Sequence, residues 1–247
     1  MPRPLIEIIC CSAEDCASAE KGGADRVELV SAIEMGGLTP SSGTLKSAVL
    51  SSKLPMMAMI RPRSGGFCYT SGEFDSMERD AELLLENGAR GLVFGILTND
   101  RKVDQSRTRK LVEKSRGAES VFHRAFDATA DPLEALEAII DCGVTRVLTS
   151  GQQKTAVEGA PMIRSLVEHA AGRIEILPGG GLRSENVQAV VQATGATQVH
   201  LSAFESIADM SMSGVDIAFN GRPALEDAYR AVSVESVSAV AERLNHS

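Results

Sequence analysis

Short apolar runs recur about eight times along the chain, roughly every thirty residues, and each one ends in polar residues or glycine. The runs cover residues 5–10, 26–30, 57–60, 91–94, 120–122, 146–148, 174–177 and 198–199. Helices are expected from Ser12 to Gly22, from Ser41 or Ser42 to Leu50, over 74–86, from Asp104 to about Ser115, from Asp131 to Cys142, over 156–170 and over 184–193 with Ser184 as cap, and after Ser233. This alternation predicts an α/β protein with a single (β/α)8 barrel of the TIM type.

One domain is expected to span residues 1–247, because this length matches one barrel. Two segments interrupt the repeat. Residues 61–73 are predicted to form a long glycine-rich loop, and residues about 204–222 an irregular loop before the C-terminal helix. Long loops on the active face of a barrel usually serve as lids or subunit contacts.

Composition narrows the function classes. The net charge is −8, which disfavours nucleic acid and anionic membranes as partners. Eighteen consecutive apolar residues occur nowhere, and residues 1–4 lead directly into a strand, so we expect neither a membrane span nor a signal peptide. Five cysteines without a disulfide-type pattern favour a reducing, cytoplasmic setting. The oligomeric state stays open, a homo-oligomer included.

Charged residues stand inside or at the ends of the first three strands. Glu7 and Glu28 lie in apolar company, where an unpaired carboxylate would be costly. One interpretation is a structural ion pair with Arg26 or Arg61, and the other is a general base or ligand-binding acid at the barrel mouth. Arg61 and Arg63 follow the third strand, and Arg63, in the glycine-rich loop, is the better candidate for binding an anion.

Histidines end two of the later strands. His123 and Asp127 belong to one dense polar motif after the fifth strand, and His200 closes the eighth. A histidine at a barrel strand end suits acid–base catalysis, because its pKa lies near working pH. Asp127 could orient the imidazole or bind substrate directly.

Glycine-rich turns mark the usual phosphate-binding position of a barrel. Gly179, Gly180 and Gly181 follow the seventh strand, and Ser202 follows the eighth. Glycine allows backbone N–H groups to approach an anion closely. The sequence therefore predicts an anion site at these residues.

Two adjacent cysteines, Cys10 and Cys11, end the first strand. Neighbouring side chains on a strand point to opposite faces, so one thiol should face the barrel and the other the helices. Zinc motifs such as CxxC or HExxH do not occur. A soft thiolate could bind Cu(I) together with a second sulfur, whereas the plainer interpretation is a pair of buried apolar cysteines.

Five motifs together resemble the CutC family of copper homeostasis proteins. They are GADRVEL at 23–29, GGLTPS at 36–41, IRPR at 60–63, FHRAFD at 122–127 and RVLTSG at 146–151, and the resemblance extends from about Leu5 to Ala203. It implies a (β/α)8 barrel that handles copper in the cytoplasm, with Cu(I) bound in some members by two cysteines. Those two positions correspond here to Ile9, which Cys10 and Cys11 follow directly, and to Val30, which has no cysteine beside it.

Two functions of different classes follow, and the sequence favours the first. The first is a CutC-type protein that binds or handles Cu(I), with Cys10 and Cys11 as candidate ligands. The second is a barrel enzyme acting on a small anionic or phosphorylated metabolite. Its candidate catalytic residues are Glu7, Glu28, Arg61, His123, Asp127 and His200. We expect these side chains to open to one mouth of the barrel.

Overall fold

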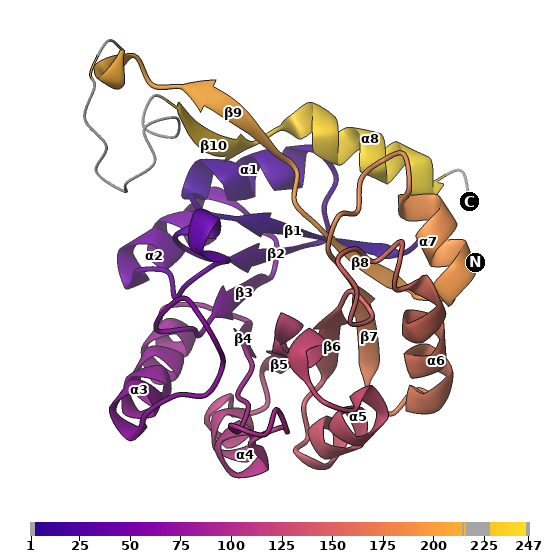
Figure 1. Ribbon diagram of the computed structural model, residues 1–247. Helices are drawn as coiled ribbons and strands as arrows, with labels where there is room; N and C mark the ends of the chain where they lie inside the picture. Colours follow the sequence, from indigo (N-terminus) through magenta and orange to yellow (C-terminus); the bar gives the residue numbers. More distant parts are fainter. Residues whose placement is uncertain (1–2, 214, 216–227, 246–247) are drawn as a thin grey trace.

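The computed structural model describes residues 3–213, 215 and 228–245, and eight parallel strands form its centre (Figure 1). The strands are β1 (Leu5–Cys10), β2 (Arg26–Leu29), β3 (Met56–Met59), β4 (Gly91–Phe94), β5 (Glu119–Phe122), β6 (Arg146–Thr149), β7 (Glu175–Pro178) and β8 (Gln198–Leu201). Their order in the sheet is β7-β6-β5-β4-β3-β2-β1-β8. A parallel bridge between Gly179 and His200 joins the ends of β7 and β8. The result is the predicted (β/α)8 barrel.

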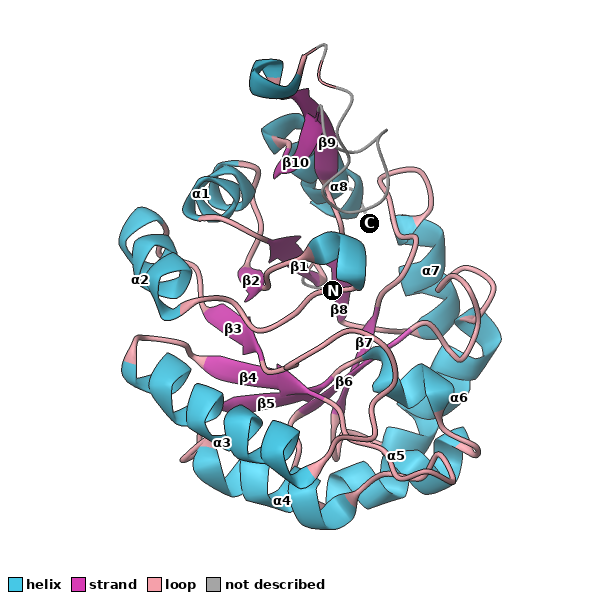
Figure 2. Cartoon of the chain, turned by 60° about the vertical axis from the view of Figure 1, so that its left-hand side comes forward, coloured by secondary structure: helices cyan, strands magenta, loops and turns pink. Residues whose placement is uncertain are grey.

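Helices surround this sheet on its outer side (Figures 1 and 2). They are α1 (Ala13–Lys21), α2 (Ser42–Ser51), α3 (Ser71–Glu86), α4 (Gln105–Lys114), α5 (Pro132–Asp141), α6 (Ala160–Ala170), α7 (Val187–Thr194) and α8 (Val234–Asn245), with 3-10 turns η1 (Ile33–Met35), η2 (Arg124–Ala128) and η3 (Met210–Met212). Ser12, Ser41 and Asp131 cap α1, α2 and α5 through their side chains. Every helix in the described part of the chain is too short or too polar to cross a membrane.

Three helix starts differ from the sequence-based prediction. Helix α3 begins three residues earlier than expected, because Thr70 and Glu73 form a capping box there. Helix α6 begins at Ala160 instead of residue 156, after a series of turns. Helix α7 begins at Val187, so Ser184 does not cap it. Sequence patterns therefore tend to include the turn that precedes a helix in the helix itself.

Side chains of the strands alternate between two apolar layers. The outer layer lies between strands and helices and includes Ile6, Ile8 and Cys10 of β1. The inner layer fills the barrel and includes Ile9, with Val30, Met57, Met59, Val93, Val121, Leu148 and Leu177 from the other strands. Polar side chains that point inward lie above or below this inner layer, and those above it form the site described next.

The segment after β8 begins with a strand. Phe204–Ala208 (β9) pairs antiparallel with Ala228–Val232 (β10), and this two-stranded ribbon projects beyond α1 and α8 (Figure 1). The irregular loop predicted at about 204–222 thus starts as regular structure, while residues 214 and 216–227 lie outside the described part of the chain. Val232 of β10 is tied to the barrel, since its N–H donates to the buried Asp15 of α1.

Candidate functional site

A cavity of about 250 Å3 opens among the C-terminal ends of the barrel strands. It is lined by Ile9, Glu28, Gly36, Met59, Arg61, Phe67, His123, Arg124, Ala125, Leu148 and His200. Four of the six predicted catalytic residues therefore share this cavity: Glu28, Arg61, His123 and His200. Glu7 lies behind them, and Asp127 lies elsewhere.

Three buried side chains are clustered on one side of this cavity, and two of them line it. Glu7 of β1, Glu28 of β2 and His200 of β8 are each at most 8% exposed. The Nδ1 of His200 lies 2.8 Å from Glu7 Oε1 and 3.9 Å from Glu28 Oε2. Strand pairing causes this proximity, because Glu7 stands opposite His200 in the β1–β8 register. Three neighbouring strands, β2, β1 and β8, thus bring two carboxyl groups and one imidazole together.

The two carboxyl groups of this chain have opposite pKa shifts. Burial alone would raise the pKa of Glu7, but the hydrogen bond to His200 and the charge of Arg26 outweigh it and lower the pKa to about 2. Burial raises the pKa of Glu28 to about 7, against the opposing charge of His200. The pKa of His200 is raised, because the charges of Glu28 and Glu7 outweigh its burial. The cluster can therefore gain or lose a proton near neutral pH.

Below the cavity, Glu7 also takes part in a structural ion pair. Its other oxygen accepts from Arg26 Nε. The Nη2 of Arg26 also donates to Gln198 Oε1, at 2.9 Å. Gln198 in turn donates to Glu175, which pairs with Arg146. The pairing expected between Glu7 and Arg26 is thus present, and it coexists with the His200 contact.

Arg61 is held rigidly at the opposite wall. Its two Nη groups donate to the backbone carbonyls of Met35, Gly37 and Gly65, each at 3.0 Å. The guanidinium lies over the Phe67 ring, 5.3 Å from its centroid. These contacts come from the loops after β2 and β3, so Arg61 does not bridge Glu7 and Glu28, one of the two roles considered for it.

His123 follows β5 and packs against the other side of the cavity. Its ring is buried, and it lies 5.1 Å from the Phe67 ring. Its Nδ1 accepts a hydrogen bond of 3.1 Å from the N–H of Ala125. Burial, with the nearby charge of Arg61, lowers the pKa of His123 to about 3. The imidazole is therefore neutral at physiological pH.

Asp127 binds the neighbouring loop instead of the imidazole. It accepts from the Thr149 hydroxyl and from the backbone N–H groups of Ser150 and Gln152, and it pairs with Arg124 at 2.8 Å. These bonds join η2 to the turn after β6. The structure thus gives Asp127 an architectural position beside the cavity.

The predicted anion-binding residues do not converge. Arg63 pairs with Glu73 of α3, away from the cavity. The turn Gly179–Gly181 packs against residues 150–156, where Gly180 O accepts from Ala156 N at 2.8 Å. Gly180 has a φ of +100°, which favours glycine. A Cβ at position 180 would lie only 3.2 Å from Arg124 Nη1, so a side chain there would crowd the guanidinium.

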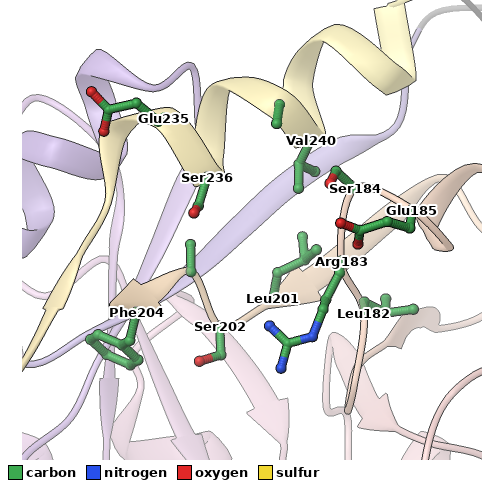
Figure 3. Close-up of a pocket in the computed structure, with 12 residues that line it drawn as sticks. Leu182, Arg183, Ser184, Glu185, Leu201, Ser202, Phe204, Glu235, Ser236 and Val240 are labelled. Carbon is green, nitrogen blue, oxygen red and sulfur yellow. The ribbon is translucent and has the colours of Figure 1, made fainter. Parts of the chain in front are cut away.

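Ser202 lines a different depression, of about 290 Å3, between β8, α8 and the segment before α7. Figure 3 shows its hydroxyl and the Arg183 guanidinium on the lower side of this groove, with Ser236 of α8 above. Ser202 and Ser236 are both exposed. The glycine turn and Ser202 thus belong to separate places on the same face.

Cys10 and Cys11, the two candidate Cu(I) ligands, do not share a face of the first strand. Cys10 lies in the outer layer with Cys16, and Cys11 packs against the inner layer, as strand alternation predicts. Burial, then the neighbouring Cys16, raises the pKa of the Cys10 thiol, and burial with Asp15 raises that of Cys11 to about 12. Cu(I) is bound by thiolates, so protonated thiols on opposite faces do not fit it.

Glu7, Glu28 and His200 could together hold a metal ion, because their ligand atoms lie within 4.8 Å of one another. Among the described residues, no other group of three such side chains lies this close together. Oxygen and imidazole donors suit a divalent ion better than Cu(I). Arg26 beside Glu7 places a positive charge against any cation there.

Two residues that line the cavity, and one beside it, were not singled out from sequence. Phe67 packs against both Arg61 and His123, and Arg124 lies at the rim with 43% of its side chain exposed. Gly95, after β4, makes room for the imidazole, since a Cβ there would lie 2.4 Å from His123 Nδ1. The motif containing Arg124 was recognised, but no sequence pattern reveals what a glycine leaves room for.

Comparisons with known proteins agree on the class of protein. The CutC family model matches residues 4–205. A family protein CutC from Treponema denticola is 50% identical over 200 residues, covering 81% of both chains. The human copper homeostasis protein cutC homolog is 45% identical, covering 81% of this chain and 73% of its own. A solved CutC protein from Streptococcus agalactiae has 35% identity and a TM-score of 0.76, covering 80% of this chain and 97% of that one.

Less similar solved structures share the fold alone. A phosphoribosylanthranilate isomerase from Thermotoga maritima is 14% identical with a TM-score of 0.59, covering 99% of this chain and 100% of that one. By fold the chain is thus a (β/α)8 barrel with a polar cavity at the C-terminal strand ends. By sequence it belongs to the CutC family, whose relatives carry the name copper homeostasis protein.

Proposed function

We propose that this protein is a barrel enzyme that moves a proton on a small anionic metabolite in the cavity at the mouth of its barrel. One observation carries the proposal: Glu28 presents a buried carboxyl oxygen with no hydrogen-bond partner, and it lines the cavity together with His200. A buried polar atom without a partner is costly, so it is usually retained for a ligand or a reaction.

The position of the cavity supports an enzymatic role. Barrel enzymes have their active sites at the C-terminal ends of the strands, where this cavity lies. Among the described residues, Arg61 has no carboxylate within ion-pair distance, and its Nη groups bind backbone carbonyls. An uncompensated buried cation favours a ligand with a negative charge.

On this proposal, Glu28 is the group that takes and returns the proton. Its pKa near 7 lets it exist in both protonation states at working pH. His200 lies beside it, with its Nδ1 3.9 Å from Glu28 Oε2, and its charge acts on the Glu28 carboxyl. Glu7 keeps the imidazole oriented through the 2.8 Å hydrogen bond. Glu7 stays ionised throughout, because His200 and Arg26 hold its pKa low.

The test is solvent-proton exchange into unknown substrates. A small-metabolite extract incubated in D2O with the protein is examined by mass spectrometry for compounds that gain deuterium. We expect such compounds with the wild type and with Glu14→Gln, an exposed carboxylate of α1, but not with Glu28→Gln. Equal labelling by wild type and Glu28→Gln, or no labelling at all, would remove the proposal.

We propose cytoplasmic Cu(I) handling as the second candidate function. The copper homeostasis name of the human relative favours it, as do the free cysteines of this chain. Cys10 and Cys11 are its candidate ligands, although their thiols have raised pKa values. Ile9 and Val30, at the positions where family resemblance implies cysteines, are apolar and lie in the inner layer. In either case the partner is a small ion or metabolite, and neither nucleic acid nor a membrane is required.

A further inference from the structure

Two N–H groups of the cavity wall have no acceptor. The Nε of Arg61 and the Nε2 of His123 are buried, line the same cavity as Glu28, and have no hydrogen-bond partner. Such groups carry a desolvation cost unless a ligand supplies the acceptor. Because both groups are hydrogen-bond donors, the part of the ligand that lies between them should be a hydrogen-bond acceptor.

The Arg61 donor has a fixed direction. Its two Nη groups donate to three backbone carbonyls on either side of the residue, so the planar guanidinium cannot rotate freely. Of the three guanidinium nitrogens, Nε is the one without a hydrogen-bond partner. A rigid buried cation of this kind is suited to an oxygen that carries or develops negative charge.

The His123 donor is defined by its tautomer. Because Nδ1 accepts from the N–H of Ala125, the proton of the neutral ring is assigned to Nε2. The low pKa of His123 keeps the ring neutral, so Nε2–H acts as a hydrogen-bond donor. It does not take up a proton from substrate, which leaves Glu28, with His200 beside it, as the acid–base group of the cavity.

Phe67 brings the two donors into one wall. Its ring centroid lies 5.1 Å from that of His123 and 5.3 Å from the Arg61 guanidinium carbon. Arg124, at the rim, supplies a second cation, which its contact with Asp127 balances in part. The volume of about 250 Å3 restricts the ligand to a small molecule.

We infer that the N–H groups of Arg61 and His123 hold the carbonyl oxygen of a small monoanionic 2-oxo acid. This inference rests on the proposed function and names its substrate class. The Glu28 carboxylate removes a proton from the carbon next to the carbonyl. The electron pair of the broken C–H bond forms a C=C bond, and the carbonyl π pair moves to oxygen, giving an enolate. Arg61 and His123 stabilise that oxygen, and Glu28 returns the proton to carbon, so no oxidant or reductant is needed.

The experiment compares matched acids that differ only in the oxygen group. Pyruvate and hydroxypyruvate carry the carbonyl, whereas lactate and glycerate carry a hydroxyl on the same skeleton. Protein labelled with 15N in arginine and histidine is titrated with each, and the Arg61 Nε–H and His123 Nε2–H resonances are followed. We expect both resonances to shift with the oxo acids at millimolar concentration and to shift far less with the hydroxy acids.

Two substitutions separate the donor from the shape of the ring. His123→Gln keeps an N–H donor at a similar distance from the backbone and should retain binding of the oxo acids. His123→Leu keeps the volume without the donor and should weaken that binding at least about tenfold. Circular dichroism of both variants checks that they are folded.

Failure of this inference is distinguishable from failure of the proposed function. Deuterium incorporation into the pyruvate methyl group in D2O reports on Glu28, while the N–H resonances report on Arg61 and His123. Exchange that depends on Glu28, with neither resonance shifted, would overturn the inference and leave the proposed function standing. Shifted resonances without exchange would support the binding mode and contradict the proton transfer. Equal shifts with oxo and hydroxy acids would overturn the carbonyl assignment.

Discussion

Two polar clusters lie side by side at the mouth of the barrel, and they differ in how completely their hydrogen bonds are satisfied. Around Asp127, the carboxylate meets the Thr149 hydroxyl, two backbone N–H groups and Arg124. In the cavity, Glu28, Arg61 and His123 each leave one buried polar atom without a partner. Both clusters follow strand ends, and both belong to motifs of the family resemblance.

The difference separates architecture from function. In a cluster whose polar atoms all have partners, the hydrogen bonds offset the cost of burial and connect two loops. Removing such a cluster should therefore lower the stability of the fold. An unsatisfied cluster is a burden on the fold, so its removal should leave stability unchanged or improve it. Measurements of stability alone can therefore distinguish the two clusters, even before a substrate is known.

The largest effect is expected at Asp127. Asp127→Ala removes the acceptor of several hydrogen bonds and leaves their donors partly buried, which should lower the free energy of unfolding by about 2–4 kcal/mol. Urea denaturation measures it, with Asp75→Asn on the exposed face of α3 as control. An unchanged midpoint would mean that Asp127 is free for a ligand and that the two clusters do not differ.

A stabilising change is expected at Glu28. Its pKa is raised from 4.5 to about 7, so the folded state keeps a proton that the unfolded chain releases between these values. The carboxyl therefore destabilises the fold increasingly as pH rises from about 4.5 to 7. Glu28→Gln removes this burden and should stabilise the protein at about pH 8 by on the order of 1–3 kcal/mol.

The gain should shrink toward about pH 5, where Glu28 is protonated in the folded state. Thermal unfolding of both proteins at the two pH values measures it. A variant that is less stable than the wild type at the higher pH would show that Glu28 forms a net favourable ion pair with His200, and so belongs with the satisfied cluster.

A smaller effect is expected at His123. His123→Ala enlarges an existing cavity, removes a donor without a partner and leaves the Ala125 N–H without its acceptor. These effects partly offset one another, so the free energy of unfolding should change by at most about 1 kcal/mol. Its neighbour Phe122 is fully buried in the outer layer, and Phe122→Ala should cost about 3–5 kcal/mol. If both variants lose stability equally, His123 is a core residue and the cavity has lost one of its donors.

The smallest effect concerns copper. Titration with Cu(I) against a competing chelator should give nearly the same weak affinity for wild type, Cys10→Ser and Cys11→Ser, because the two thiols lie on opposite faces and are protonated. Tight one-to-one binding that either substitution abolishes would favour Cu(I) handling over the enzyme.

Much of the fold could be predicted because its signals are local. The apolar runs, the capping residues Ser12 and Asp131, and the proline after Asp131 mark elements within a few residues. Errors occurred where a turn looks like a helix start. Ser184 precedes α7 without capping it, because the cap depends on backbone geometry that sequence alone does not give.

The sequence predicted where the site residues lie better than it predicted which side chains they contact. Strand ends converge in any barrel, so the shared cavity of Glu28, Arg61, His123 and His200 could be expected. The contacts of residues in the loops could not be predicted, because they depend on the path of the loop backbone. Arg63 turns to Glu73, and the space for His123 depends on Gly95, a residue with no chemistry of its own.

Titration of Glu28 by 13C NMR of the side-chain carboxyl, assigned with Glu28→Gln, tests directly whether the cavity holds a group that can transfer a proton. We expect a midpoint of about 7, because burial outweighs the charge of His200, while Glu7 should stay ionised down to about pH 2. A midpoint near the ordinary 4.5 would show that Glu28 is a charged structural residue at neutral pH. The cavity would then contain no group poised to transfer a proton.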